Sequence, residues 1–131
     1  MKTKSKAYHF IATYTSLTAV LTDHNLAALG DAFVNFVYSL ALSNRTGKAA
    51  GAKVKGTLLA EALRRAELRK HMPSRMTTHK LADAAEALLV YAWLHGCVTI
   101  EESVATLEED SDSIEGLTQL LKKAKNRIKL S

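Results

Sequence analysis

Apolar residues recur at helical spacing along almost the whole chain, and this periodicity limits the fold more than any other feature. One such face comprises Leu26, Leu29, Phe33, Val37 and Leu40. Residues three, four and seven positions apart share one side of an α-helix. Sustained two-residue alternation and Asn-Gly or Asp-Gly hairpin turns, which indicate strands, are absent. We therefore predict an all-α, single-domain bundle of six to seven helices over residues 1–131.

Capping residues and helix breakers divide this pattern into segments. Asp23 is a predicted N-cap, and Asn44–Gly47 is the predicted exit of the same helix. The lone proline, Pro73, lies in a predicted loop, and Gly96 ends the apolar helix that follows it. The predicted helices cover residues 10–21, 26–43, 49–70 (as one helix or two), 77–95, a segment from the capping box at 99–102, and 114–128.

The net charge of +5 is unevenly distributed. Residues 1–100 contain 13 Lys and Arg against 6 Asp and Glu, residues 101–115 contain 7 acids, and residues 116–131 contain 5 basic residues. Such segregation suits contact with a polyanion, because neutralising phosphates releases counterions. An ordinary solvated basic surface is an equally good interpretation of the charge alone.

Cysteine content and apolar run length indicate a cellular compartment. The single cysteine, Cys97, excludes an internal disulfide and any cysteine-cluster zinc site. The longest apolar run, residues 84–94, is too short to span a bilayer, and the N-terminal sequence lacks the pattern of a signal peptide. We expect a cytoplasmic protein that does not contact a membrane.

Three carboxylates interrupt the two most apolar helices. Asp31 lies among small and apolar residues, and Asp83 and Glu86 are three positions apart, near one helix face. Burying such groups is costly unless they are paired or bound to a cation. If the two helices cross there, the carboxylates converge into an all-oxygen set suited to Mg²⁺. The alternative is that they pair with Lys or Arg at the edge of the helix interface.

Two motifs in these helices resemble the signatures of the ribonuclease III catalytic domain family. Leu29–Ala32 (Leu-Gly-Asp-Ala) is similar to the first signature, and Ala82–Leu88 (Ala-Asp-Ala-Ala-Glu-Ala-Leu) to the second. Thr57–Leu63 resembles the Thr-Leu-Ala helix that the family places between them. The resemblance is strongest over residues 24–96.

This resemblance implies an all-helical, usually dimeric endonuclease that hydrolyses double-stranded or structured RNA during RNA processing. Asp31, Asp83 and Glu86 would be its catalytic and metal-binding residues, with Mg²⁺, or alternatively Mn²⁺, as the cofactor. No double-stranded RNA-binding domain follows residue 96, so RNA would contact the catalytic domain and its basic residues. The candidates are Lys48, Lys53, Lys55, Arg64, Arg65, Lys122 and Lys125.

The sequence also departs from the family pattern. The family's Glu four residues before the Asp is Ala27 here, as in the stand-alone Mini-ribonuclease III group, and an acid seven residues before it is His24. The aromatic residue that contacts the partner subunit is Ala28. These departures motivate a second hypothesis, a degenerate domain that binds RNA or a ribosomal assembly without cleavage. A third is a basic helical interaction or DNA-binding module.

Overall fold

The computed structural model describes residues 8–131, and within them the chain is all-helical and contains no strand. Six α-helices and one 3-10 helix follow in order: α1 (Leu17–Leu21), α2 (His24–Thr46), α3 (Gly56–Arg65), η1 (Arg69–His71), α4 (Thr78–Leu94), α5 (Ile100–Glu109) and α6 (Ser113–Arg127). The predicted fold class is confirmed.

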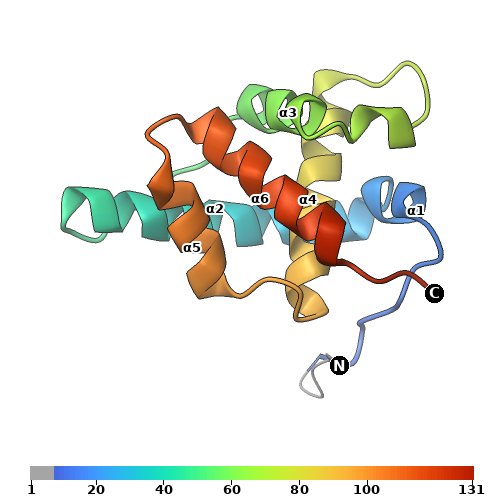
Figure 1. The fold of residues 1–131 in the computed structure, drawn as a ribbon, viewed down its shortest axis with the longest axis horizontal. Helices are drawn as coiled ribbons and strands as arrows, with labels where there is room; N and C mark the ends of the chain where they lie inside the picture. Colours follow the sequence, from blue (N-terminus) through green and yellow to red (C-terminus); the bar gives the residue numbers. More distant parts are fainter. Residues whose placement is uncertain (1–7) are drawn as a thin grey trace.

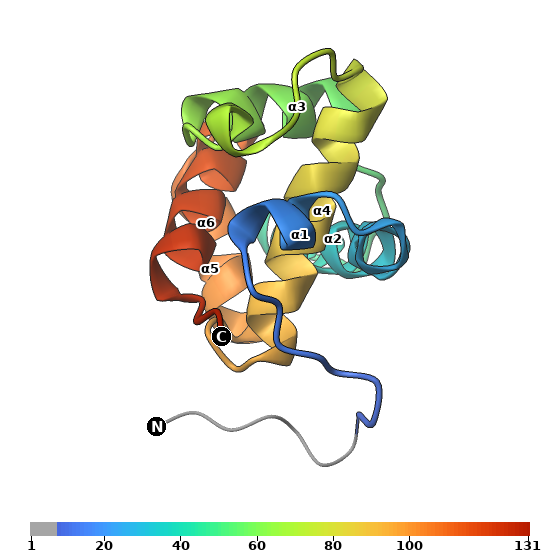
Figure 2. The same ribbon diagram turned by 90° about the vertical axis from the view of Figure 1, so that its right-hand side faces the viewer.

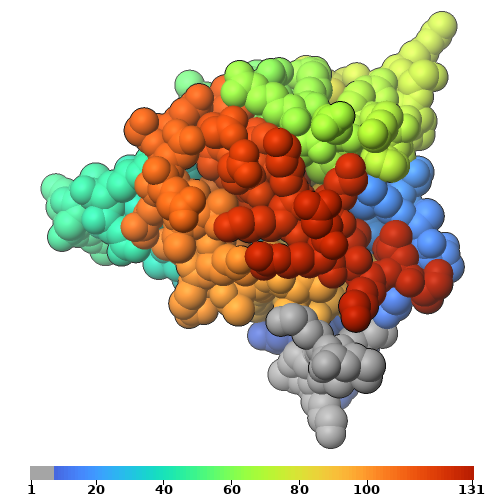
Figure 3. Space-filling model, viewed as in Figure 1, coloured from blue at the N-terminus to red at the C-terminus, as the bar shows by residue number. Residues whose placement is uncertain are grey.

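Helix α4 is the centre of the bundle. Its residues are apolar on every side, and 12 of its 17 are buried, as expected for a helix surrounded by others. It packs against α1, α2, α3 and α6, whereas α5 packs against α2 and α6. Figure 2 shows α2 and α6 on opposite sides of α4. Together α5 and α6 form one face of the molecule, with α3 along its edge (Figures 1 and 3).

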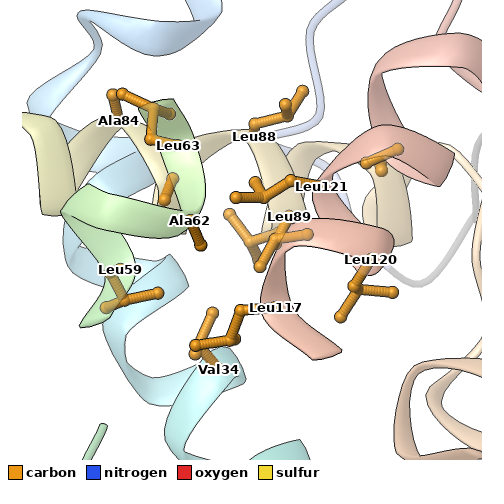
Figure 4. Close-up of a cluster of buried hydrophobic side chains, with 14 of the residues drawn as sticks. Val34, Leu59, Ala62, Leu63, Ala84, Leu88, Leu89, Leu117, Leu120 and Leu121 are labelled. Atoms are coloured by element: carbon orange, nitrogen blue, oxygen red, sulfur yellow. The ribbon is translucent and has the colours of Figure 1, made fainter. Parts of the chain in front are cut away.

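The core lies where α3, α4 and α6 meet (Figure 4). Leucines at helical spacing supply most of it, and they are fully buried because each helix directs its apolar face inward. The labelled side chains of this cluster are Val34, Leu59, Ala62, Leu63, Ala84, Leu88, Leu89, Leu117, Leu120 and Leu121.

Most predicted boundaries are confirmed. Asp23 caps α2 by accepting a hydrogen bond from the Leu26 amide, and Gly47 ends the helix in the left-handed conformation with φ of 79°. Thr77 caps α4, and Thr99 caps α5. The ambiguous region 49–70 contains α3 and η1, and residues 49–55 before α3 are not helical.

The prediction of a helix over residues 10–21 is wrong for its first part, because only Leu17–Leu21 is helical. Residues 8–16 instead cross the end of α4. The Tyr14 amide donates to the Tyr91 hydroxyl (3.1 Å), and His95 Nε2 lies 3.0 Å from the Ala12 carbonyl oxygen. The Ser131 amide donates to the Tyr14 carbonyl oxygen (3.1 Å). These long-range partners satisfy backbone groups that a helix would otherwise pair internally.

Helix α2 is long and apolar enough, by length and composition, to cross a membrane, and it alone meets this criterion within residues 8–131. The apolar run length in the sequence had predicted no such segment. In this fold α2 packs along α4 and α5, and Asp31 and Asn35 interrupt its apolar residues. One-third of its apolar stretch is buried in these contacts.

Candidate active site

The contact between α2 and α4 is centred on Gly30. A Cβ atom at Gly30 would lie 2.1 Å from the Glu86 carbonyl oxygen and 3.0 Å from the Glu86 Cβ. Only glycine allows the two backbones to approach so closely. The glycine of the first motif therefore brings that motif against the glutamate of the second.

A cleft of about 550 Å³ opens beside this crossing. Asp31 enters its wall from α2, and Asp83 and Glu86 enter from α4. Lys53, from the segment between α2 and α3, lines the same cleft. The fold therefore brings together all three carboxylates selected from the sequence, although Asp31 is more than 50 residues from Asp83 and Glu86 in the chain.

The three carboxylates have different local partners. Asn35 Nδ2 donates to Asp31 Oδ1 (3.2 Å). His79 Nε2 lies 3.5 Å from Asp83 Oδ2. Among residues 8–131, none of the three acids forms an ion pair with Lys or Arg. The alternative interpretation, pairing with basic residues at the interface edge, is therefore not what the structure shows.

Glu86 is the buried member of the set, with only 6% of its surface exposed. Burial raises its pKa to about 8, and a hydrogen bond with Asp31 and the negative charges of Asp31 and Asp83 contribute to the increase. The Lys53 ammonium acts in the opposite direction. The cleft thus concentrates more negative charge than its own residues compensate.

This donor set fits a divalent cation in chemistry. Carboxylate oxygens from two helices face one cleft, and a cation would offset the burial of Glu86 as a carboxylate and its repulsion by Asp31 and Asp83. Within the described residues, no three His, Cys, Asp or Glu side chains already surround a common point as closely as metal ligands do. Binding would therefore require side-chain rotation of these acids toward the ion.

The positions that depart from the family pattern line the same cleft. His24, Ala27 and Ala28 all lie on its α2 wall, beside Asp31. A carboxylate at position 27 would therefore have faced the same space. Position 27, where the family's acid is missing, therefore lies at the site, and Lys53 is a charged residue of the same cleft.

The candidate RNA-binding residues are dispersed. Lys53 lies in the cleft, and Lys55 is the N-cap residue of α3. Arg64 and Arg65 both pair with Glu61, at 3.5 and 3.2 Å. The others are remote from the cleft: Lys48 follows the end of α2, and Lys122 and Lys125 lie on α6, across α4 from α2 (Figure 2).

Other polar groups that were not predicted from the sequence lie near the carboxylates. Asn35 follows Asp31 by four residues and His79 precedes Asp83 by four, so the helical i, i+4 rule could have found both. A second cavity of about 310 Å³ adjoins the cleft and contains Arg75 and Lys80. It shares Asp83 with the cleft. No local sequence signal indicated this cavity.

Fold and site together define an all-helical domain in which two crossing helices build an acidic cleft. The ribonuclease III family model matches residues 24–128, and the chain belongs to this family of RNA-processing nucleases. The match extends past the region of strongest motif resemblance and includes α5 and α6. A comparison with curated proteins found no match.

Proposed function

We propose that the protein is a Mg²⁺-dependent endoribonuclease that hydrolyses phosphodiester bonds in double-stranded or structured RNA. The observation that carries this proposal is the shared cleft of Asp31, Asp83 and Glu86 at the α2–α4 crossing. The family match supports the RNA-processing class of reaction. Mn²⁺ is the alternative cofactor, because it also prefers oxygen ligands.

In this mechanism Asp31, Asp83 and Glu86 hold the cation. When bound, the cation supplies an activated water and stabilises charge on the phosphate. Glu86 would hold the cation as a carboxylate, so the proton that its raised pKa favours would have to leave Glu86. Lys53 contributes a positive charge at the wall of the cleft, where it attracts the RNA backbone.

The test uses a labelled RNA duplex with Mg²⁺. We expect the unaltered protein to cut it, and Asp31→Asn and Glu86→Gln each to reduce the rate by at least about 100-fold, because each removes a ligand of the cation. Glu101→Gln, at an exposed position on α5, is the matched control and should cut normally. An intact duplex that still binds in a gel shift would instead support the degenerate, RNA-binding hypothesis that Ala27 motivates.

We further propose that the protein forms a homodimer through the outer face of α2. Leu29, Ala32 and Phe36 share this face, and Leu29 and Phe36 remain 39% and 54% exposed. Tyr8 and Phe10 are also exposed, and Tyr8 packs against Trp93, which stacks on Phe33 of α2. Exposed apolar surface of this kind is typical of an interface. Ala28, where the family's aromatic contact is missing, directly precedes Leu29 on α2.

Phe36→Asp is expected to convert the dimer to a monomer, because it places a charge in the apolar contact. Light scattering coupled to size-exclusion chromatography measures the change. Leu130→Asp is the control, since Leu130 is 39% exposed beyond the end of α6. A dimer that persists in Phe36→Asp, or dissociates equally in Leu130→Asp, would contradict the use of this face.

A further inference from the structure

The extended segment between α2 and α3 is bound to α2 by a regular row of side chains. Ser43 Oγ accepts a hydrogen bond from the Ala50 amide (2.9 Å), and Ser39 Oγ accepts one from the Ala52 amide (2.9 Å). The row ends at Asn35, whose Oδ1 accepts from the Val54 amide (2.8 Å). Three α2 side chains thus bind every second residue of an antiparallel segment.

The spacing of this row has a geometric reason. Four residues of an α-helix rise about 6 Å. Two residues of an extended chain advance about 6.6 Å. Polar side chains at every fourth helix position therefore meet alternate amides of the segment. The backbone amides of Ala52 and Val54 point toward α2, and Lys53, the residue between them, lines the cleft.

Asn35 differs from the two serines because it has a second partner at the site. Its Nδ2 donates to Asp31 Oδ1 (3.2 Å) while its Oδ1 accepts from Val54. A carboxamide has a donor end and an acceptor end. The Val54 amide requires the acceptor end, and this fixes the donor end toward Asp31. Asn35 therefore couples the carboxylate of α2 to the segment that bears Lys53.

We propose that Asn35 is a positioning residue of the active site, an inference that rests on the proposed function. It holds Oδ1 of Asp31, which limits the orientations of this carboxylate in the cleft, and it fixes Lys53 at the cleft wall through Val54. Residues that orient metal ligands in this way contribute about 10- to 100-fold to metal affinity or activity.

The variant Asn35→Ser tests this role. A serine retains an acceptor for the Val54 amide, as Ser39 and Ser43 do for theirs, but it is too short to reach Asp31. We expect Mn²⁺ affinity, measured by calorimetry or electron paramagnetic resonance, to fall about 10-fold. The kcat for an RNA duplex should fall similarly, while KM stays within about twofold and the free energy of unfolding is unchanged. Ser43→Ala, which loosens the far end of the segment, is the matched control.

Each outcome decides the proposal. Unchanged Mn²⁺ affinity in Asn35→Ser, or an equal loss in Ser43→Ala, would show that Asn35 only attaches the segment to α2 and does not position Asp31. Absence of Mn²⁺ binding by the unaltered protein would instead overturn the proposed function itself. A measurement without any change at position 35 supplements these: the side-chain amide resonance of Asn35 should shift in Asp31→Ala and stay in place in Asp112→Ala. If the Asn35 side-chain amide resonance did not shift in Asp31→Ala, the coupling between Asn35 and Asp31 would be disproved.

Discussion

Replacing Gly30 with alanine is expected to lower the free energy of unfolding by about 3 kcal/mol or more. The added methyl group would lie 2.1 Å from the Glu86 carbonyl oxygen, which is backbone and cannot move aside like a flexible side chain. The two helices α2 and α4 would have to separate, and the side chains at their interface would lose packing contacts. Thermal unfolding should show a midpoint lower by on the order of 10 °C.

Gly51→Ala is the control for this experiment. Gly51 lies in the segment before α3, and an added Cβ would meet no atom within 4 Å. Its replacement should leave stability unchanged or slightly increased, because alanine restricts the unfolded chain. If Gly30→Ala unfolded at the same temperature as the unaltered protein, the close crossing of α2 and α4 would be disproved.

Glu86→Gln is expected to stabilise the cation-free protein progressively as pH rises. Glu86 has a pKa of about 8 in the folded protein against 4.5 as its ordinary value. The stability that its bound proton contributes is complete below about pH 4.5 and is lost as pH rises toward 8. The reason is that the unfolded chain releases this proton at a lower pH than the folded protein does. A shift of this size corresponds to about 3–5 kcal/mol. Glutamine remains neutral and avoids this loss.

Urea unfolding at pH 5 and pH 8.5, with a chelator present, measures this effect. The difference in free energy of unfolding between Glu86→Gln and the unaltered protein should grow between the two pH values. The same difference for Glu101→Gln, an exposed glutamate, should not grow. An equal difference for Glu86→Gln at both pH values would show that the Glu86 carboxylate is not held in its protonated form by the fold.

Most of the fold could be predicted from the sequence because the local spacing of apolar and capping residues indicates helices. Asp23 and the capping box that begins at Thr99 were selected from the sequence alone, and Asp23 and Thr99 each accept the expected amide hydrogen bond. The error over residues 10–16 has the opposite cause. Tyr14 meets Tyr91 and Ser131, which are distant in the chain, so local periodicity contained no information about its conformation.

In the site, too, some features could be predicted from the sequence and others could not. The motifs predicted that Asp31, Asp83 and Glu86 would converge, and the Gly30 contact explains how the helices bring them to one cleft. Their catalytic role stays a prediction. Asn35 was missed because its importance depends on a segment that folds back onto α2, and the sequence between α2 and α3 suggested only an ambiguous helix.

The position of the crossing contact has a mechanical consequence. Any change in the angle between α2 and α4 displaces each point in proportion to its distance from the Gly30–Glu86 contact, which acts as a pivot. Asp31 and Glu86 adjoin this pivot and so keep their separation when the helices tilt. The far end of α2, at Thr46, and the segment that leads back from it would swing most. The acids of the site therefore lie at the part of the α2–α4 interface that a tilt between the helices would move least.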